Sequence, residues 1–447
     1  MRRAAVLVPL LVFLGVYVTH AGHGFIQDDY GWVYENRVRG IADFAHLFVS
    51  DNGFYRPLVA VSFAVNEWMF GAAPLGYGLT NVALALGCAA AVAWLIRGVG
   101  LPRGAATFGA LVWLMNFYFT KTAILWISGR TALLVTLAGV LAASALVRRR
   151  TGLALAWLAA ALLAKEEAVL LPVILTLWLL LLDQDRPSRR RRVLIWLAGS
   201  AAVLAAYFLA RSFTGAMTLV TAPPYYRFTF DGAAVWRNVR EYADRTSTLA
   251  VAATIAAVLL LGRPRDASRP DLRAAAAGAV WLILGLGFAY VLPVRSDLYA
   301  ALPAVGSGLA AAALVSWRWE GAAPAARRRA LVVGAAAALV LAPVYWTRTS
   351  RMVRVAEFSA ARLDELVALT VDLPPGAHVR VDEADSADPQ SPSLEAAFGV
   401  GMGEALSLRL GHPVDAVLVT PRAAAPAGVT FDRQLRLEGG HLIDTRR

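Results

Sequence analysis

The sequence predicts a polytopic α-helical membrane protein with about eleven transmembrane helices and a small C-terminal extracytoplasmic α/β domain. Three observations predict this fold class. Of the 447 residues, 58% are hydrophobic and the mean hydropathy is +0.56, which exceeds the apolar share of soluble domains. The apolar residues are gathered into long runs, and arginine clusters separate these runs. We therefore expect lipid to surround most of the chain.

The charge of the chain does not indicate a nucleic-acid partner. A net charge of +12 and a pI of about 10.2 would suggest one in a soluble protein. Here the arginines lie in short clusters between apolar runs, a pattern typical of membrane topology. The sequence shows no basic helix and no aromatic surface for RNA. We therefore predict that the chain binds membrane lipids and no nucleic acid.

The apolar runs define the expected helices. The first run follows Met1-Arg2-Arg3, and no small-residue cleavage site precedes a soluble domain, so we interpret it as a retained helix rather than a signal peptide. Several runs are shorter than the roughly 20 residues of a full span, which suits an active site sunk into the membrane face. The runs lie near residues 4–19, 75–96, 105–119, 123–147, 153–164, 168–182, 193–210, 249–261, 274–291, 298–316 and 330–345.

Arginine clusters orient the expected bundle. They fall in alternate loops, so the positive-inside rule places all of them in the cytoplasm. The N-terminus is then cytoplasmic, the C-terminus is extracytoplasmic, and we expect the plasma (inner) membrane of a bacterium. The clusters are Arg2-Arg3, Arg97 with Arg103, Arg148–Arg150, Arg186–Arg192, Arg263–Arg273, and Arg318 with Arg327–Arg329.

We expect two domains, a transmembrane domain over residues 1–347 and a small soluble domain over residues 348–447. The extracytoplasmic loop 20–74 belongs to the first domain, and within it the apolar residues of Ile41–Ser50 predict an amphipathic helix at the membrane interface. The role of the second domain stays open between covering the active site and gripping an acceptor. Its expected elements are helices over 352–373 and 394–410 and strands over 378–381 and 416–419.

An acidic pair lies shortly after the first expected helix, in the loop 20–74. Asp28 and Asp29 follow Gln27 and precede Tyr30. Carboxylates at a membrane face are costly unless they are solvated or used. Two adjacent carboxylates can divide the work of a site, one as a base and one as an orienting group or cation ligand. A solvated turn after a helix is the alternative interpretation of this dipeptide alone.

A second charged group, Lys165-Glu166-Glu167, separates two short apolar runs. Lys165 is one of only two lysines in the chain, the other being Lys121. A lysine here could face a phosphate while Glu166 holds it in place. The alternative is a hairpin turn that stays hydrated.

Further candidates lie at other expected extracytoplasmic positions. Arg130 and Arg295 depart from the positive-inside trend, so each either reaches to the interface or binds an anionic group there. The loop near 211–246 carries Tyr225 and Tyr226 among arginines. Tyrosine rings could stack on a sugar, and an aromatic belt at the membrane interface explains them equally well.

The sequence has no recognisable metal, nucleotide or hydrolase motif. Its six histidines form no HxxxH or HExxH pattern. The single cysteine, Cys88, lies in an apolar run, so we interpret it as a core residue and infer no redox compartment from it. The acidic pair still leaves a divalent cation open as a cofactor.

The order of these signals resembles the GT-C class of glycosyltransferases. The resemblance is to the branch of bacterial multispanning transferases and transmembrane O-mannosyltransferases, and it covers residues 20–180 well, extends weakly through 295–299, and leaves out the tail. No TPR array is present. The motifs that carry it are Phe25–Asp29, Glu35-Asn36, Tyr55–Leu58, Asn66, Phe70-Gly71, Pro74–Tyr77, Thr80-Asn81, Trp126–Arg130 and Ala164–Glu166.

The resemblance implies a GT-C-like fold and an inverting transfer of a hexosyl or pentosyl group. Such enzymes move a sugar from a polyprenyl-phosphate carrier to an acceptor hydroxyl on a glycolipid, wall polymer or protein. By this resemblance Asp28 is the general base and Asp29 assists it. The family's conserved basic groups correspond to Arg130 and Lys165. The residues expected to bind substrate are Arg56, Arg130, Lys165, Glu166, Arg295, Tyr225 and Tyr226, of which Arg295, Tyr225 and Tyr226 are added on their positions alone.

Two stretches depart from the family pattern. Gly78 stands where histidine is frequent, and Asn116–Thr122 replaces a stretch that usually carries His-Pro and an acid. The resemblance therefore leaves the acceptor and the metal dependence open. Two other function classes stay as alternatives: a transporter or lipid flippase, which would show charges through the bundle and inverted repeats, and a noncatalytic scaffold of envelope glycan assembly.

Overall fold

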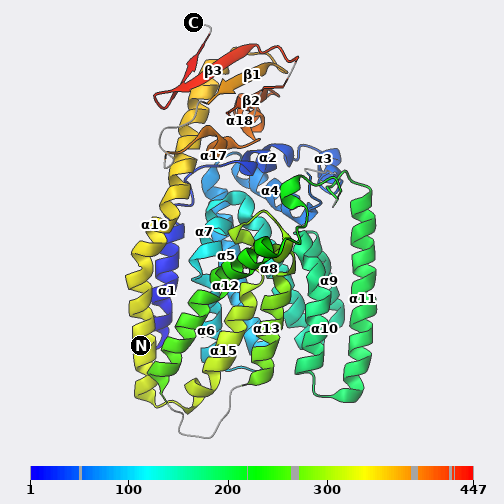
Figure 1. Ribbon diagram of the computed structural model, residues 1–447, viewed down its shortest axis with the longest axis vertical. Coiled ribbons are helices and arrows are strands. Elements are labelled where there is room, and N and C mark those ends of the chain that lie inside the picture. The colour runs from blue at the N-terminus through cyan, green and yellow to red at the C-terminus, as the bar shows by residue number, and fades with distance from the viewer. Residues whose placement is uncertain are drawn as a thin grey trace.

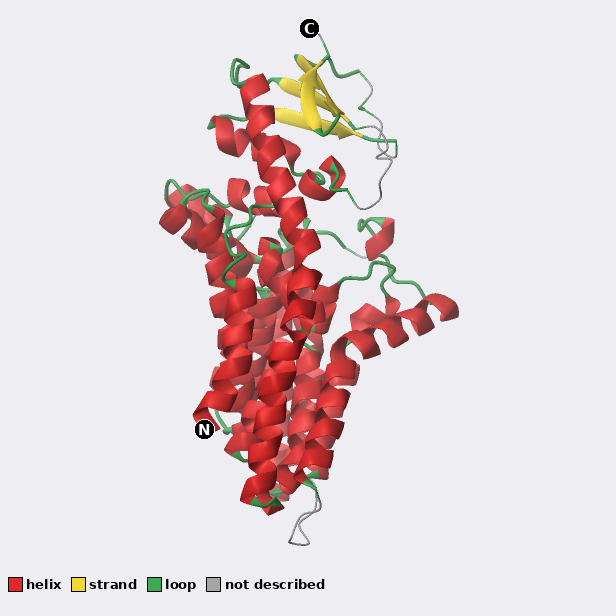
Figure 2. Cartoon of the chain, turned by 90° about the vertical axis from the view of Figure 1, so that its left-hand side faces the viewer, coloured by secondary structure: helices red, strands yellow, loops and turns green. Residues whose placement is uncertain are grey.

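A computed structural model gives the structure of the chain and describes residues 2–49, 53–218, 220–262, 271–383, 391–421, 425–426 and 428–445. Long helices run side by side along the longest axis (Figure 1). Short helices cap one end of this bundle, and a small sheet lies beyond them at the same end (Figure 2). We call this the sheet end and the other the arginine end.

The described helices and strands have the following bounds. The α-helices are α1 (Arg2–Tyr17), α2 (Asp28–Glu35), α3 (Ile41–His46), α4 (Pro57–Phe70), α5 (Pro74–Gly98), α6 (Arg103–Leu114), α7 (Phe117–Leu125), α8 (Arg130–Val147), α9 (Thr151–Leu162), α10 (Leu171–Leu182), α11 (Arg186–Ser212), α12 (Gly232–Leu261), α13 (Leu272–Gly285), α14 (Gly287–Val291), α15 (Ala304–Gly321), α16 (Pro324–Thr370), α17 (Leu394–Phe398) and α18 (Met402–Leu410). The 3-10 helices are η1 (Ile127–Gly129), η2 (Glu166–Leu170), η3 (Pro224–Tyr226) and η4 (Asp297–Ala300), and the strands are β1 (His378–Asp382), β2 (Asp415–Val419), β3 (Arg433–Glu438) and β4 (His441–Asp444).

Six helices of the described chain are long and apolar enough to cross a membrane, or seven if α6 and α7 form one bent span. The two helices meet at 63°, because Asn116 restarts the helix by accepting a hydrogen bond from Tyr118 N. Four further apolar helices, at Val6–Tyr17, Pro57–Phe70, Thr151–Leu162 and Leu272–Gly285, have 10–17 residues. A polytopic membrane architecture is thus confirmed, whereas the count of about eleven crossings stays a prediction.

Glycines set the close packing of the central helices. A Cβ added to Gly306 of α15 would lie 2.3 Å from the carbonyl oxygen of Gly278 in α13. On another face of α15, a Cβ on Gly308 would lie 2.7 Å from the oxygen of Gly109 in α6. Small residues let helix backbones approach closely where lipid supplies no hydrophobic drive for association. Larger side chains at these positions would push the helices apart.

The arginine end brings several of the arginine clusters together. Asp183 forms ion pairs with Arg149, at 3.7 Å, and with Arg192. Asp183 and its two arginine partners line a cavity of about 260 Å³, and Arg273 lines the same cavity. Residues 263–270 of one predicted cluster lie outside the described residues. The clusters that contain Arg149, Arg192 and Arg273 therefore share one end of the bundle, as alternate loops require, while their cytoplasmic location stays a prediction.

The sheet end carries the first long loop and its short helices. α3 confirms the predicted helix, although it ends at His46 and the predicted Ser50 lies outside the described residues. Ile41 and Val49 expose large apolar side chains, whereas Leu47 packs on α4. An exposed apolar face beside a membrane bundle is typical of a helix lying at the interface.

The C-terminal part contains a four-stranded sheet in the order β2-β1-β3-β4. β1 pairs in parallel with β2 and with β3, and β3 pairs antiparallel with β4. The predicted strands correspond to β1 and β2, and the predicted helix over 394–410 is divided into α17 and α18 at Gly399, whose φ is +52°. α16 passes residue 347 without a break. The division into domains at that residue therefore stays a prediction.

Candidate functional site

Asp29 is an internal anchor of the acidic pair. Its side chain is fully buried, and one carboxylate oxygen accepts hydrogen bonds from Ser128 N at 2.7 Å and Ser128 Oγ at 2.5 Å. The other oxygen accepts one from Ile26 N at 3.0 Å. Burial raises the pKa of Asp29 to about 7, although these hydrogen bonds oppose the rise. Asp29 thus fastens the start of α2 to η1.

Asp28 lies beside this anchor and reaches solvent. The surrounding protein raises its pKa through desolvation, while the nearby charge of Arg56 opposes the rise. A carboxylate with a raised pKa is a stronger base than a free one. The two acids therefore have different surroundings, and Asp28 is the one that a substrate can reach.

Gln27 precedes the pair in a rare backbone conformation, with φ 49° and ψ −122°. A residue with a side chain adopts this region at a cost of about 1–3 kcal/mol, and surrounding contacts must maintain it. The backbone N–H of Gln27 donates a hydrogen bond to Ala397 O in α17, with the two atoms 2.8 Å apart. The acidic pair is thus presented by a turn that distant segments hold.

Arg56 and Glu166 form a forked ion pair next to Asp28. Arg56 Nε and Nη2 lie 3.2 and 2.8 Å from Glu166 Oε2, and the guanidinium also lies over the ring of Phe54, with its central carbon 3.9 Å from the centroid. Arg211, at the end of α11, adds a contact of 3.6 Å to Glu166 Oε1. Burial alone would raise the pKa of Glu166, but Arg56 outweighs it and holds this pKa below its usual value.

Lys165 lies immediately before Glu166 and is almost fully buried. Its Nζ forms an ion pair of 3.2 Å with Glu167 Oε2 and lies 4.5 Å from the centroid of the Tyr299 ring. Burial lowers the pKa of Lys165 and raises that of Glu167, and each residue opposes the shift of the other. Arg56 is close enough for its charge to influence both pKa values. The predicted residues Asp28, Arg56, Lys165 and Glu166 therefore gather at one place, here called the acid–base cluster.

Tyr226 joins the acid–base cluster, and Tyr225 lies at its edge. Tyr226 packs edge-on against Phe54, with ring centroids 5.5 Å apart, and its pKa is raised by burial and influenced by Arg56 and Asp28. Tyr225 packs against Tyr226, with centroids 4.8 Å apart, and is half exposed. The two rings thus offer an aromatic surface beside the charged groups.

Arg130 lies apart from the acid–base cluster, inside the protein. It is fully buried, and its Nε donates to Asn81 Oδ1 at 3.0 Å. Its other nitrogens donate to the carbonyl oxygens of Ser62 and Tyr77. The guanidinium also lies over the ring of Phe63, at 4.3 Å from the centroid. These contacts join α4, α5 and α8 beneath the acidic pair.

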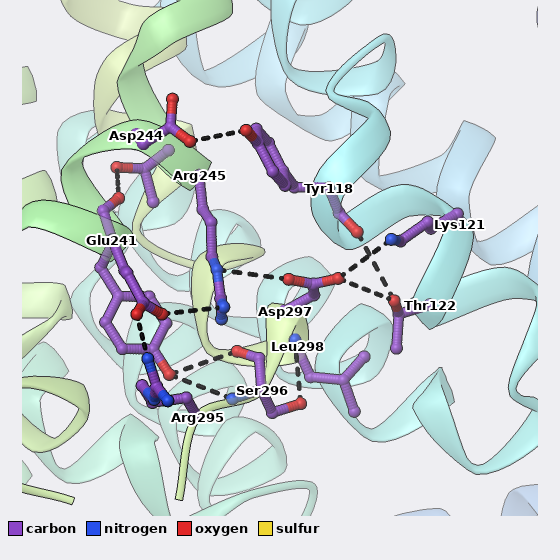
Figure 3. A network of polar contacts seen from close by, with 12 residues as sticks. Tyr118, Lys121, Thr122, Glu241, Asp244, Arg245, Arg295, Ser296, Asp297 and Leu298 are labelled. Carbon is purple, nitrogen blue, oxygen red and sulfur yellow. Dashed lines mark hydrogen bonds and ion pairs between the residues drawn. The ribbon is translucent and has the colours of Figure 1, made fainter. Parts of the chain in front are cut away.

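Arg295 belongs to a second network of charges, shown in Figure 3. It forms an ion pair with Glu241, which also pairs with Arg245 at 3.1 Å. Asp297 pairs with Lys121 and with Arg245, each at 3.4 Å (Figure 3). This network fastens η4 to α7 and α12, and the same η4 presents Tyr299 to Lys165. Arg295 thus lies in a network that supports the acid–base cluster through η4.

No group of three His, Cys, Asp or Glu residues in the described ranges is placed to hold a metal ion. Glu166 and Glu167 are already paired with Arg56 and Lys165. His23, in the same loop as the acidic pair, has a nitrogen 2.8 Å from Leu125 O. The possible divalent cation therefore finds no evident set of ligands in this part of the chain.

Several residues of the site were not singled out from the sequence. They are Glu167, the partner of Lys165; Arg211 and Tyr299; and Ser128, the partner of Asp29. Glu167 and Ser128 lie inside the motifs that were noted, so the adjacent charge and the hydroxyl were available signals. Tyr299 ends the stretch 295–299 of the weak resemblance, but only the packing of η4 brings it to the cluster. Arg211 lies in no motif that was noted, and only the packing of α11 brings it there.

The comparisons with known proteins give a match in fold. The sequence matches no protein-family model and no curated protein. The structure is similar to that of ArnT from Cupriavidus metallidurans bound to undecaprenyl phosphate, with a TM-score of 0.54 and 14% sequence identity. The similarity covers 92% of this chain and 85% of that chain. The expectation of a polytopic membrane fold of the GT-C class is therefore confirmed.

Proposed function

We propose that the protein is an inverting glycosyltransferase that moves a hexosyl or pentosyl group from a polyprenyl-phosphate carrier to an acceptor hydroxyl. The GT-C fold supports this class of reaction, and the similar ArnT structure holds undecaprenyl phosphate. The proposed reaction takes place at the sheet end, on the extracytoplasmic face of a bacterial plasma membrane. The proposed acceptor is a glycolipid, a wall polymer or a protein, and the proposed relationship is to the O-mannosyltransferase branch.

One observation carries the proposal: an exposed carboxylate, Asp28, lies near the partly buried guanidinium of Arg56, and the buried Lys165 belongs to the same acid–base cluster at the sheet end. A sugar transfer from a lipid phosphate needs a base for the acceptor and positive charge for the leaving phosphate. The acid–base cluster contains both within one set of connected elements, namely α2, α4 and η2. Preorganised cations in a site that excludes water stabilise developing negative charge strongly.

In the proposed mechanism Asp28 takes the proton of the acceptor hydroxyl. The acceptor oxygen forms a bond to the anomeric carbon from the face opposite the phosphate. The bond between that carbon and the phosphate oxygen breaks, and polyprenyl phosphate leaves with the electron pair. Attack from the opposite face inverts the anomeric configuration. Asp29, which is buried and fully hydrogen-bonded, holds Asp28 in place and takes no proton from the acceptor.

The remaining predicted residues receive supporting roles. We assign the leaving phosphate to Arg56 and Lys165, with Glu166 holding Arg56 in its orientation. Tyr225 and Tyr226 supply the aromatic surface for the sugar. Arg295 is proposed to meet the phosphate from the side of η4, and Arg130 to support the acidic pair from below through α4 and α5.

The proposal is tested with purified protein in lipid and a panel of polyprenyl-phosphate sugars. Release of polyprenyl phosphate is measured with and without divalent cation and with glycolipid, glycan and peptide acceptors. We expect release with one donor, and a product whose anomeric configuration is opposite to that of the donor. Retention of configuration would contradict the mechanism. Transport of the lipid across the bilayer without any release of phosphate would instead support the flippase alternative.

A further inference from the structure

The C-terminal part of the chain, which follows residue 347 and is also called the tail below, holds the backbone on both sides of Asp28. On one side, Gln27 N donates to Ala397 O of α17 at 2.8 Å. On the other side, the Tyr30 hydroxyl lies 2.8 Å from Ser359 Oγ of α16. The Tyr30 ring also stacks on Phe398, with centroids 5.7 Å apart. α2 is therefore held at its first turn by two separate segments, α16 and α17.

The conformation of Gln27 depends on close approach by the tail. A Cβ on Gly401 would lie 2.8 Å from the carbonyl oxygen of Gln27, and one on Gly399 would lie 3.6 Å from its Cγ. Only glycine at residue 401 leaves room for the Gln27 backbone as it stands. The positive φ of Gln27 is thus maintained by a fitted surface that the turn after α17 provides.

α17 is in turn fastened to the sheet. The carboxylate of Glu383, which follows β1, accepts hydrogen bonds from Leu394 N at 2.6 Å and Glu395 N at 3.2 Å. A carboxylate at a helix N-terminus satisfies free amide groups and interacts favourably with the helix dipole. A continuous path of contacts therefore runs from β1 through Glu383 and α17 to Gln27.

From the opposite side, the membrane bundle holds the same turn. Asp29 is bonded to Ser128 of η1, as described above. Asp28 therefore lies between one neighbour fixed by the tail and another fixed by the bundle. Its carboxylate can keep a constant position relative to Arg56 only while both attachments hold.

We infer that the C-terminal part is a positioning element for the reaction, with Gly401, Ser359 and Phe398 holding the Gln27–Tyr30 turn so that Asp28 is aligned with the acceptor hydroxyl. This inference rests on the proposed function. In this role the C-terminal part supplies no catalytic group and no contact to the donor. Arg56 and Lys165 take their partners from η2, through Glu166 and Glu167. A disturbed tail contact should therefore slow the chemical step and leave donor binding intact.

The experiment uses the full-length protein in lipid and compares Gly401→Ala with Gly31→Ala. Both exchange glycine for alanine at a residue with ordinary backbone angles, but a Cβ on Gly31, within α2 itself, meets no atom of another segment within 4 Å. We expect Gly401→Ala to lower kcat about 10- to 100-fold, since small misplacements of reacting groups have effects of this size. Donor KM should stay within about twofold, and Gly31→Ala should match the wild type in both constants.

Two further measurements separate positioning from general damage. Ser359→Ala removes one partner of Tyr30 and should lower kcat less than Gly401→Ala does, again without a change in donor KM. Hydrogen exchange of the amides in 26–35 should accelerate in Gly401→Ala while exchange in the membrane helices stays unchanged. If Gly401→Ala accelerates this exchange but keeps the wild-type kcat, or changes neither quantity, the inference is overturned although the proposed function stands. Absence of turnover in the wild type overturns the proposed function and this inference with it.

Discussion

The Arg56 guanidinium and the Glu166 carboxylate meet in a fork, with Nη2 2.8 Å from Oε2, although 110 positions separate the two residues. The fork joins the start of α4 to η2, and through Arg56 it places a positive charge beside Asp28. A forked arginine–carboxylate pair fixes orientation as well as charge. This geometry leads to the first prediction.

Arg56→Gln should raise the donor KM about tenfold or more. The variant loses the cation assigned to the lipid phosphate and leaves Glu166 with Arg211 alone, at 3.6 Å. Steady-state kinetics with the active polyprenyl-phosphate sugar measure the effect. Arg39→Gln is the matched control. Arg39 lies in the same loop as Arg56 and also forms an ion pair with a glutamate, Glu67, but its side chain is 67% exposed and lies outside the acid–base cluster. Equal KM values for the two variants would remove Arg56 from the donor site.

Lys165→Gln should weaken donor use more than Arg295→Gln. Lys165 is buried within the acid–base cluster, whereas Arg295 is partly exposed and paired with Glu241 in the second network. A buried cation interacts with a bound phosphate through less solvent screening. The ratio kcat/KM for the donor measures both variants side by side. A larger loss in Arg295→Gln would assign the phosphate to the η4 side of the site.

Asp29 should make the stability of the protein depend on pH. Its folded pKa of about 7 lies above its ordinary value of 3.8, so the folded state favours the protonated form. The contribution is fully present below about pH 4 and is lost as the pH rises toward 7, at up to about 1.4 kcal/mol per unit. Asp29→Asn cannot ionise, so its deficit in Tm relative to the wild type should shrink between pH 5 and pH 8.

The measurement is thermal unfolding in lipid across this pH range. Asp43→Asn is a control, because Asp43 is a carboxylate of the same loop with solvent-exposed hydrogen bonds to Arg39 N and Gly40 N. A difference in Tm between Asp29→Asn and the wild type that stays constant from pH 5 to pH 8 would show that Asp29 is ionised throughout.

The sequence predicted the membrane class because apolar runs and arginine clusters are local signals. It also predicted Asp28, Arg56, Lys165 and Glu166, whose approach in space the structure describes. It predicted helices over 330–345 and 352–373 but not that residues 346–351 join them into the single helix α16, because the charged residues after Tyr345 resemble a loop although nothing breaks the helix there. β3 and β4 were missed because these short strands are largely polar and gain their order from pairing with β1 and with each other.

The separate environments of the two acids could not be predicted either. Asp28 and Asp29 are chemically identical neighbours, and only the packing of η1 against α2 buries Asp29 against Ser128. The contact between Gln27 and Ala397 likewise depends on the tail returning to the first loop. Such long-range contacts have no counterpart in local composition or periodicity.

The central claim is that Asp28 is the base of a glycosyl transfer, and Asp28→Asn tests it most directly. Release of polyprenyl phosphate from the active donor is followed for the wild type, Asp28→Asn and Asp29→Asn, with the fold of each checked by thermal unfolding. Loss of a general base lowers the rate about 10²- to 10⁴-fold. We expect Asp28→Asn to lower kcat by this amount with an unchanged donor KM. A folded Asp28→Asn variant that keeps the wild-type kcat would contradict the account.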